Sequence, residues 1–291
     1  SPQDEQILRY QNQKTADKLN NRNQGNIGVL IPSVTMPIYP GILRGIEDEC
    51  HRQGFTIFLG NYDANPQKEK NYMKTFLDKG IRGLIISPSY NSLENNFYKT
   101  LIDLDVPVVL NDISLPAYNF NLVATDNIAA AYRACSAICS KKSRRIGFLC
   151  YEKNTYSSRQ REAGYRMAME DHGLAFHHSL IFDAGPGGIY TDRAIRQIKR
   201  TAHLDGLLIA NEPDPADLAG LLSVLSNLRL ALFCYTANSL TAANIAAYVV
   251  QPKYEIGCQS AQLLCESIQQ KNNQNNSLQK TILISAEVKC L

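Results

Sequence analysis

The stretch IGVLIPSVTMPIYPGILRGIEDECHRQG, residues Ile27–Gly54, decides the fold of this chain. It reads as an apolar strand, a polar loop and an amphipathic helix that ends at a glycine. The same order returns at Ile146–Gly173. Positions that recur at constant spacing are Ile27, Gly28, Leu30, Gly45 and Gly54, which match Ile146, Gly147, Leu149, Gly164 and Gly173. A duplicated strand–loop–helix module predicts two similar α/β domains.

Strands and helices alternate through both halves of the chain. Expected strands lie at 27–32, 55–59, 83–86, 106–110, 122–124, 146–150, 179–182, 206–209 and 230–234. Expected helices lie at 39–53, 66–79, 93–104, 127–140, 160–172, 190–202 and 214–226, with Asp126 as a helix cap. Such alternation requires right-handed crossovers and parallel sheets. The predicted fold class is therefore α/β, with two similar Rossmann-like subdomains.

The tail after the second half contains a further helix at 252–270 and a final strand at 281–288. Because both repeats are complete before it, we expect this tail to cross back, so that crossover strands join the subdomains. The predicted boundaries are a polar arm at 1–26, a first subdomain at 27–141 with 252–284, and a second at 142–251 with 285–291.

Composition restricts the class of protein. A formal net charge of +3 is too small to indicate a nucleic-acid surface by itself, and no apolar run approaches the roughly 18 residues of a membrane span. The eight cysteines form no Cys-x-x-Cys pair, so they favour small hydrophobic side chains in a reducing cytosol over a metal site. Neither a phosphate-binding loop nor a nucleophile elbow occurs. We expect no cofactor, no metal, no membrane partner and no enzyme activity.

Polar side chains follow the expected strands in both halves. They occur at 35–39, 87–89, 111–112, 126, 154–161, 211–212 and 236–238. In open parallel sheets, ligands bind outside the carboxyl ends of the strands. Carboxylates, amides and an arginine pair with sugar hydroxyls, and tyrosines cover the apolar side of a ring. Asn and Asp after strands are also ordinary turn and helix-cap residues, so the individual positions remain open between the two roles.

At these residues the chain resembles the effector-binding domain of LacI/GalR-type bacterial transcriptional regulators, which share a fold with periplasmic sugar-binding proteins. The matching pieces, in family order, are IGVLIP (27–32), GIEDEC (45–50), RGLIISPS (82–89), VPVVLND (106–112), VATDN (123–127), RRIGFL (144–149), RQREAGY (159–165), IANE (209–212) and QPKYEIG (251–257). RRIGFL and QPKYEIG are more typical of the regulators than of the periplasmic proteins.

The resemblance implies a set of ligand-contacting side chains. Arg161 matches the family's arginine three residues before a glycine, and Asn211 the asparagine of its A-N-D motif, with Glu212 replacing the aspartate. Thr236 stands in the region of a family aspartate, so a charge-assisted hydrogen bond to the sugar is lost there. The full expected set is Tyr39, Asp112, Asp126, Tyr156, Arg161, Asn211 and Thr236.

The expected function is sensing by a longer, cytoplasmic regulator. The resemblance implies a sugar-like effector bound in an interdomain cleft, a homodimer with candidate surfaces at 39–53 and 252–270, and operator DNA bound by a domain outside this chain. Residues 1–9 are too short for a helix-turn-helix. Tyr10, Ala16 and Leu19 match the spacing of a LacI hinge helix, but a linker from a GntR-type winged helix stays open. The rivals are a periplasmic or receptor-linked solute-binding protein and an enzyme on a doubly wound fold.

Overall fold

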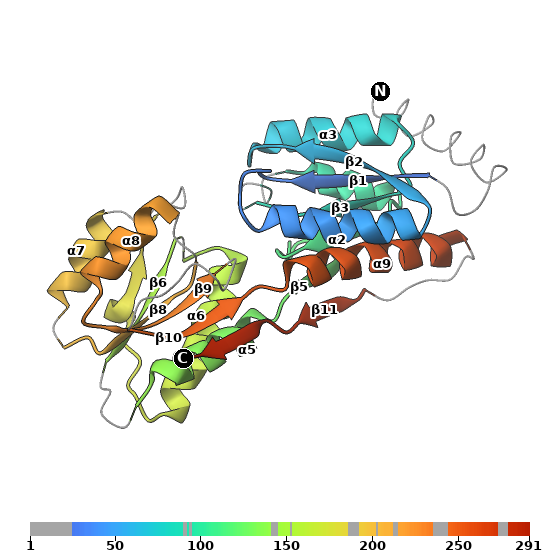
Figure 1. The fold of residues 1–291 in the computed structure, drawn as a ribbon. Helices are drawn as coiled ribbons and strands as arrows, with labels where there is room; N and C mark the ends of the chain where they lie inside the picture. The colour runs from blue at the N-terminus through green and yellow to red at the C-terminus, as the bar shows by residue number, and fades with distance from the viewer. Residues whose placement is uncertain are drawn as a thin grey trace. The chain divides into compact units, whose positions relative to one another are not determined.

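The computed structural model describes residues 25–89, 92, 95–140, 145–151, 153–185, 192–201, 203–211, 215–234, 244–272 and 279–291. The chain divides into two compact units (Figure 1). Unit 1 contains the chain up to Ala124 together with Lys253–Ile284, and unit 2 contains Thr125–Pro252 together with Ser285–Leu291. Within the described residues, each unit holds one six-stranded sheet. The hinge positions Tyr10, Ala16 and Leu19 lie outside these residues.

Unit 1 is a sheet with helices on both faces. Its strand order is β11-β5-β4-β3-β1-β2. The strands are β1 (Gly25–Ile31), β2 (Phe55–Asn61), β3 (Gly83–Ile86), β4 (Val108–Asn111), β5 (Asn121–Thr125) and β11 (Thr281–Ile284). The helices are α2 (Tyr39–Arg52), α3 (Pro66–Asp78), α4 (Phe97–Asp103) and α9 (Lys253–Asn272). Strands β1 to β5 pair in parallel, and Figure 1 shows α3 on one face and α2 with α9 on the other.

Unit 2 repeats this layout. Its strand order is β12-β10-β9-β8-β6-β7. The strands are β6 (Ile146–Cys150), β7 (Ile181–Asp183), β8 (Gly206–Ile209), β9 (Arg229–Cys234), β10 (Ile245–Val250) and β12 (Glu287–Cys290). The helices are α5 (Asn127–Ile138), α6 (Tyr156–Asp171), α7 (Asp192–Arg200) and α8 (Pro215–Val224). One buried core lies between the sheet and α5 and α6, and a second lies beneath α7 and α8.

The repeated glycines lie where each unit packs its closest helix pair. A Cβ on Gly45 of α2 would lie 2.1 Å from the Tyr254 carbonyl oxygen of α9, and one on Gly164 of α6 would lie 2.2 Å from the Ile128 carbonyl oxygen of α5. Both distances are far below van der Waals contact. The helices therefore touch backbone to backbone, and only glycine fits at these crossings.

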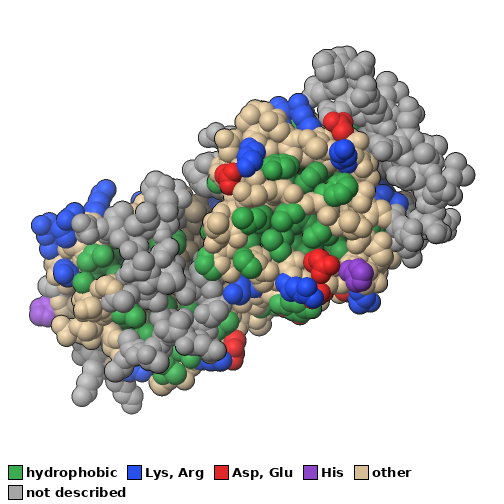
Figure 2. All heavy atoms as spheres, turned by 45° about the horizontal axis from the view of Figure 1, so that its top comes forward, with side chains coloured by type: hydrophobic (Ala, Val, Ile, Leu, Met, Phe, Trp, Pro, Cys, Tyr) green, Lys and Arg blue, Asp and Glu red, His purple; other side chains and the backbone are tan. Residues whose placement is uncertain are grey.

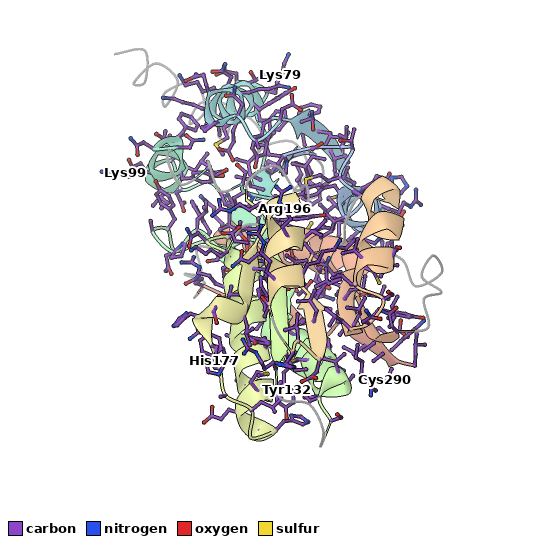
Figure 3. The ribbon with its side chains drawn as sticks, turned by 90° about the vertical axis from the view of Figure 1, so that its left-hand side faces the viewer. Lys79, Lys99, Tyr132, His177, Arg196 and Cys290 are labelled. Atoms are coloured by element: carbon purple, nitrogen blue, oxygen red, sulfur yellow. The ribbon has the colours of Figure 1, made fainter. Side chains whose placement is uncertain are left out.

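The end of the α5–α6 pair is also held by a polar contact. Tyr132 of α5, labelled in Figure 3, donates its hydroxyl proton to Asp171 Oδ2 at the end of α6 over 2.8 Å. Gly173 follows with φ +65°, and Gly54 ends α2 in the same way with φ +81°. Glycine adopts this left-handed conformation without steric cost, so the third repeated glycine is a helix stop.

The predicted fold class is confirmed, with several local corrections. The sequence places residues 27–141 in the first subdomain, but α5 packs on α6 and belongs to unit 2. The expected strand at 281–288 divides into β11 and β12, which join different sheets. Strand β12 pairs antiparallel with β10, so the sheets are mostly rather than wholly parallel.

Several element boundaries also differ from the expectation, and one strand was not expected. The predicted strand at 179–182 begins as a 3-10 turn, His178–Leu180, before the short β7. Helix α6 begins at Tyr156 rather than at 160, because Thr155 caps it by accepting a hydrogen bond from Ser158 N at 3.3 Å. Strand β10 was not predicted, although its sequence IAAYVV is a short apolar run of the kind that forms buried strands.

Candidate functional site

Arg161 is the centre of the polar groups at the carboxyl edge of the unit 2 sheet. Its Nε donates to Asn127 Oδ1 at 2.8 Å and its Nη2 to Gln251 Oε1 at 3.0 Å, while Nη1 donates to the Ala210 carbonyl oxygen. The guanidinium carbon lies 4.0 Å from the centroid of the Phe233 ring. These partners stand at the start of α5 and at the carboxyl ends of β8, β9 and β10. Arg161, only 3% exposed, therefore ties three strand ends to a helix.

Asn211 continues this edge toward the first strand of unit 2. It follows Ala210 directly after β8, and its Oδ1 accepts a hydrogen bond from the Tyr151 backbone N–H at 3.2 Å. Because Tyr151 follows β6, the contact joins the loops after two neighbouring strands. The side chain is half-buried. Asn211 thus lies at the position where a ligand at the carboxyl edge of the sheet would contact its side chain.

Two further expected residues begin helices of unit 2. Asp126 caps α5, as predicted, because its Oδ1 accepts a hydrogen bond from Ala129 N at 3.0 Å. The next residue, Asn127, is the one that receives the Arg161 Nε. Tyr156 is the first residue of α6 and is half-buried. Arg161 and Asn211 therefore share the carboxyl edge of the unit 2 sheet, and Asp126 precedes the Asn127 that Arg161 contacts.

The corresponding edge of unit 1 carries a second polar set. Asn111 ends β4, where its Nδ2 donates to Ser260 Oγ of α9 at 2.8 Å and its Oδ1 accepts from Ser87 Oγ at 3.5 Å. Ser87 follows β3, and its carbonyl oxygen accepts the Tyr62 hydroxyl at 2.9 Å. All four side chains are buried. The carboxyl ends of β3 and β4 are thus fixed against α9 and the end of β2.

The two expected site residues of unit 1 belong to the same edge. Asp112 follows Asn111 with φ +63°, a left-handed conformation that aspartate tolerates better than most residues. Its backbone N–H donates to the Val123 carbonyl oxygen at 2.8 Å, and its side chain is buried. Tyr39 is buried as the first residue of α2, after the loop that follows β1. Thr236 and Glu212 lie outside the described residues.

The sequence did not indicate the residues that hold the site together. Asn127 and Gln251 occur in the quoted pieces VATDN and QPKYEIG, but no role could be assigned to them from spacing. Phe233 and Ser260 carried no signal at all. The role of each residue depends on the tertiary fold, which brings segments far apart in the chain together at one sheet edge.

The buried cysteines have thiols of low reactivity. Burial raises the pKa of the thiols of Cys50, Cys150 and Cys265 to about 12. Because the thiolate is the nucleophile and the metal ligand, these side chains act as small hydrophobes. Among the described residues, no group of three or more His, Cys, Asp or Glu side chains is placed to hold a metal ion. No helix in the described part of the chain is long and apolar enough to cross a membrane.

Comparison with known families agrees with this geometry. Residues 24–186 match the family described as periplasmic binding proteins and sugar binding domain of LacI family, and residues 137–288 match a periplasmic binding protein-like domain. The first match covers more than half of the chain. The chain therefore belongs to the family of periplasmic binding proteins and LacI-type sugar-binding domains, which is a family of binding domains and not of enzymes.

Individual relatives are regulators by name. The chain is 27% identical over 283 residues to the ribose operon repressor of Halalkalibacterium halodurans, covering 91% of this chain and 79% of that protein. It is 33% identical over 142 residues to the ribose operon repressor of Bacillus subtilis, covering 49% of this chain and 41% of that protein. The crystal structure of the transcription regulator CcpA of Lactococcus lactis superposes with a TM-score of 0.75 at 20% identity, covering 91% of this chain and 97% of that chain. The last likeness concerns the fold alone.

Proposed function

We propose that this chain is the effector-binding domain of a sugar-responsive transcriptional regulator. A small sugar or sugar derivative binds at the carboxyl edges of the two sheets and controls operator binding by a DNA-reading domain of the same protein. The observation that carries the proposal is the arrangement around Arg161, whose guanidinium is held rigid at such an edge beside Asn211. The family match and the repressor names of the relatives support the regulatory role.

The chemistry of the edges fits a polyhydroxyl ligand. Three acceptors and an aromatic face fix the plane of the Arg161 guanidinium before any ligand arrives, so little conformational entropy is lost when a sugar oxygen binds. An amide at Asn211 pairs with a hydroxyl as both donor and acceptor. In unit 1, Asp112 and Tyr39 supply a carboxylate and an aromatic group. These roles are assigned by the resemblance and by edge position.

Regulation follows from differential binding. An effector shifts the conformational equilibrium of a regulator only to the extent that it binds one conformation more tightly than another. Residues from both units are in the proposed set, so a single sugar would link the units when bound. A change of that kind is what a DNA-reading domain attached to unit 1 would sense.

A thermal-shift screen followed by calorimetry tests the proposal. D-ribose is the first compound, because two relatives are named ribose operon repressors, and other monosaccharides, acid sugars and phosphosugars follow. Asn211→Ala should abolish the ligand-induced rise in melting temperature. The matched control is Asn244→Ala, whose amide lies at the opposite edge of the same sheet and bonds Leu225 and Leu228 carbonyls. Equal ligand response in both variants would refute the site.

The homodimer has its own structural argument. Figure 2 shows hydrophobic side chains gathered on the face of unit 1 that carries the edge strand β2. On this strand Leu59 is 45% exposed, and Ile57 and Phe58 are half-buried. An apolar edge strand is open to pairing with another chain. We propose that a second copy covers β2 and the adjoining outer face of α2, since α2 and α9 use their facing sides on each other.

Light scattering measures this assembly directly. Leu59→Lys should convert a dimer into a monomer, because a charge would be placed in an apolar interface. Met167→Lys on α6 is the control, since Met167 is 50% exposed but lies outside this patch. A monomeric wild-type chain, or a dimer that survives Leu59→Lys, would contradict the assignment.

A further inference from the structure

Glu69 is a fully buried carboxylate that the proposed ligand set does not use. It lies on α3 and is 0% exposed. Its Oε1 accepts hydrogen bonds from Ser92 Oγ at 2.8 Å and from the Tyr98 hydroxyl at 2.7 Å, and its Oε2 accepts one from Asn95 Nδ2 at 2.8 Å. Within the described part of the chain, no lysine or arginine forms an ion pair with it. The donors that the structure describes, two hydroxyls and an amide, are all neutral.

Two of the three donors to Glu69, Ser92 and Asn95, lie between β3 and α4 in the chain. Ser92 Oγ, which donates to Glu69, also accepts the backbone N–H of Ser89 at 2.9 Å. Asn95 Oδ1 accepts the backbone N–H of Phe97 at 3.0 Å, at the start of α4. Ser92 and Asn95 therefore each connect Glu69 to a backbone N–H group, that of Ser89 and that of Phe97. Ser89 stands two residues after Ser87, which contributes to the unit 1 carboxyl edge.

The third donor, Tyr98, connects Glu69 to helix α4. The Tyr98 ring packs against Tyr118 and Phe120, with ring centroids 5.5 Å and 6.0 Å away. Its hydroxyl points away from this aromatic group to Glu69. Helix α4, on which Figure 3 labels Lys99, is thus fixed by packing on one side and by a buried carboxylate on the other.

We propose that Glu69 is a positioning residue for the ligand site, which holds Ser92 and Asn95 in place and, through the bond from Ser89 N to Ser92 Oγ, fixes Ser89 beside the carboxyl edge of unit 1. The inference rests on the proposed function, because it names the residue that shapes one side of that site. Glu69 itself touches no ligand. It acts through Ser92 and Asn95, and its effect on affinity is indirect.

A reciprocal exchange of the Glu69–Asn95 pair separates this role from ordinary packing. In Glu69→Gln one of the two acceptor oxygens becomes an amide donor, so at least one of the three donors to Glu69 must lose its acceptor or reverse its direction. Asn95→Asp instead places two carboxylates together. The double variant E69Q/N95D restores one carboxylate, one amide and the hydrogen bond between them. Asp78→Asn, at the exposed end of the same helix, controls for the loss of a negative charge.

Two readouts are measured on the full chain, namely amide hydrogen exchange at Ser89, Ser92 and Phe97 and the dissociation constant for the sugar that stabilises the wild type. Each single variant should accelerate exchange and weaken binding by about tenfold, the size expected when a buried polar group loses its partner. The double variant should recover both values, and Asp78→Asn should change neither.

The outcomes distinguish this inference from the function on which it rests. If the wild type binds a sugar and Glu69→Gln binds it equally well, Glu69 is not a positioning residue and the proposed function stands. Loss of stability without loss of affinity leads to the same conclusion. A double variant that fails to recover affinity also overturns the inference. A wild type that binds no sugar overturns the proposed function, and the ligand role of Glu69 with it.

Discussion

Arg161 illustrates how a single residue serves structure and binding together. The family resemblance at its position before Gly164 implies a ligand contact, and Arg161→Ala would then remove binding without affecting folding. The structure changes that expectation, because the side chain is buried and donates to Asn127, Gln251 and the Ala210 carbonyl. Replacing it leaves buried acceptors without donors. Binding and stability should both fall.

We predict that Arg161→Ala lowers the free energy of unfolding by about 3 kcal/mol, the cost of unpaired buried polar groups. Urea denaturation followed by circular dichroism measures the change. The exposed Arg159→Ala on the same helix is the control and should stay within about 0.5 kcal/mol of the wild type. Matching denaturation midpoints for the two variants would show that the buried contacts add nothing to stability.

Glu69 predicts a pH dependence of stability. Burial, partly offset by hydrogen bonds from Asn95, Tyr98 and Ser92, raises the pKa of this carboxyl above its ordinary value of 4.5. A folded-state pKa above the unfolded value means that the folded protein favours the protonated form. The contribution of Glu69 is therefore fully present below pH 4.5 and is lost as the pH rises through the raised pKa.

The measurement compares urea unfolding of the wild type and of Glu69→Gln at increasing pH. The wild type should lose stability relative to the variant as the pH rises above 4.5, because only the wild type must ionise a buried group. Parallel stability curves for the two proteins would contradict the raised pKa.

At the scale of elements, the helix crossings explain the duplicated glycines. Spacing in the sequence located Gly45 and Gly164 but gave no reason for them. The structure supplies it, since each lies against the carbonyl oxygen of a partner helix. The partner of Gly45 is α9, from the tail of the chain, and the partner of Gly164 is α5. The helix of each repeated strand–loop–helix module thus pairs with a helix that lies outside that module.

We predict that Gly164→Ala destabilises the protein by about 2 kcal/mol or more, because overpacked side chains force the backbone apart. Gly220→Ala in α8 is the control, since its added Cβ would meet nothing within 4 Å. That substitution should stabilise the protein by about 0.5 to 1 kcal/mol through helix propensity. Thermal denaturation should show a lower melting temperature for Gly164→Ala and a higher one for Gly220→Ala. An unchanged or raised melting temperature for Gly164→Ala would show that the crossing tolerates a methyl group.

Most elements were predictable because strand and helix periods are local properties of the sequence. The strands at 83–86, 146–150 and 206–209 have the bounds that were expected. The assignment of α5 to unit 2 was not predictable, because it depends on the contact between Ile128 and Gly164 rather than on any local pattern. The change of subdomain between residues 284 and 285 was predicted, but the break of the last strand into β11 and β12 was not. Its two halves have the same strand-forming composition but pair with β5 and β10 of different sheets.

For the whole molecule, the internal repeat and the family agree on a two-unit binding domain. The resemblance assigned Arg161, Asn211 and Asp112 to the site, and the rule that ligands bind at the carboxyl ends of parallel strands led us to expect them at sheet edges. Their supports could not be foreseen, because Asn127, Gln251 and Ser260 reach the edge only through the tertiary fold. The central claim is that one sugar effector uses the carboxyl edges of both sheets.

Hydrogen exchange with and without a saturating sugar tests that claim most directly. Binding should slow exchange after β3 and β4 in unit 1, at 87–89 and 111–113, and after β6 and β8 in unit 2, at Tyr151 and at 210–211. Amides at the opposite edges, such as those of Asn121 and Asn244, should exchange as before. Protection confined to one unit, or found at the opposite edges, would contradict the account.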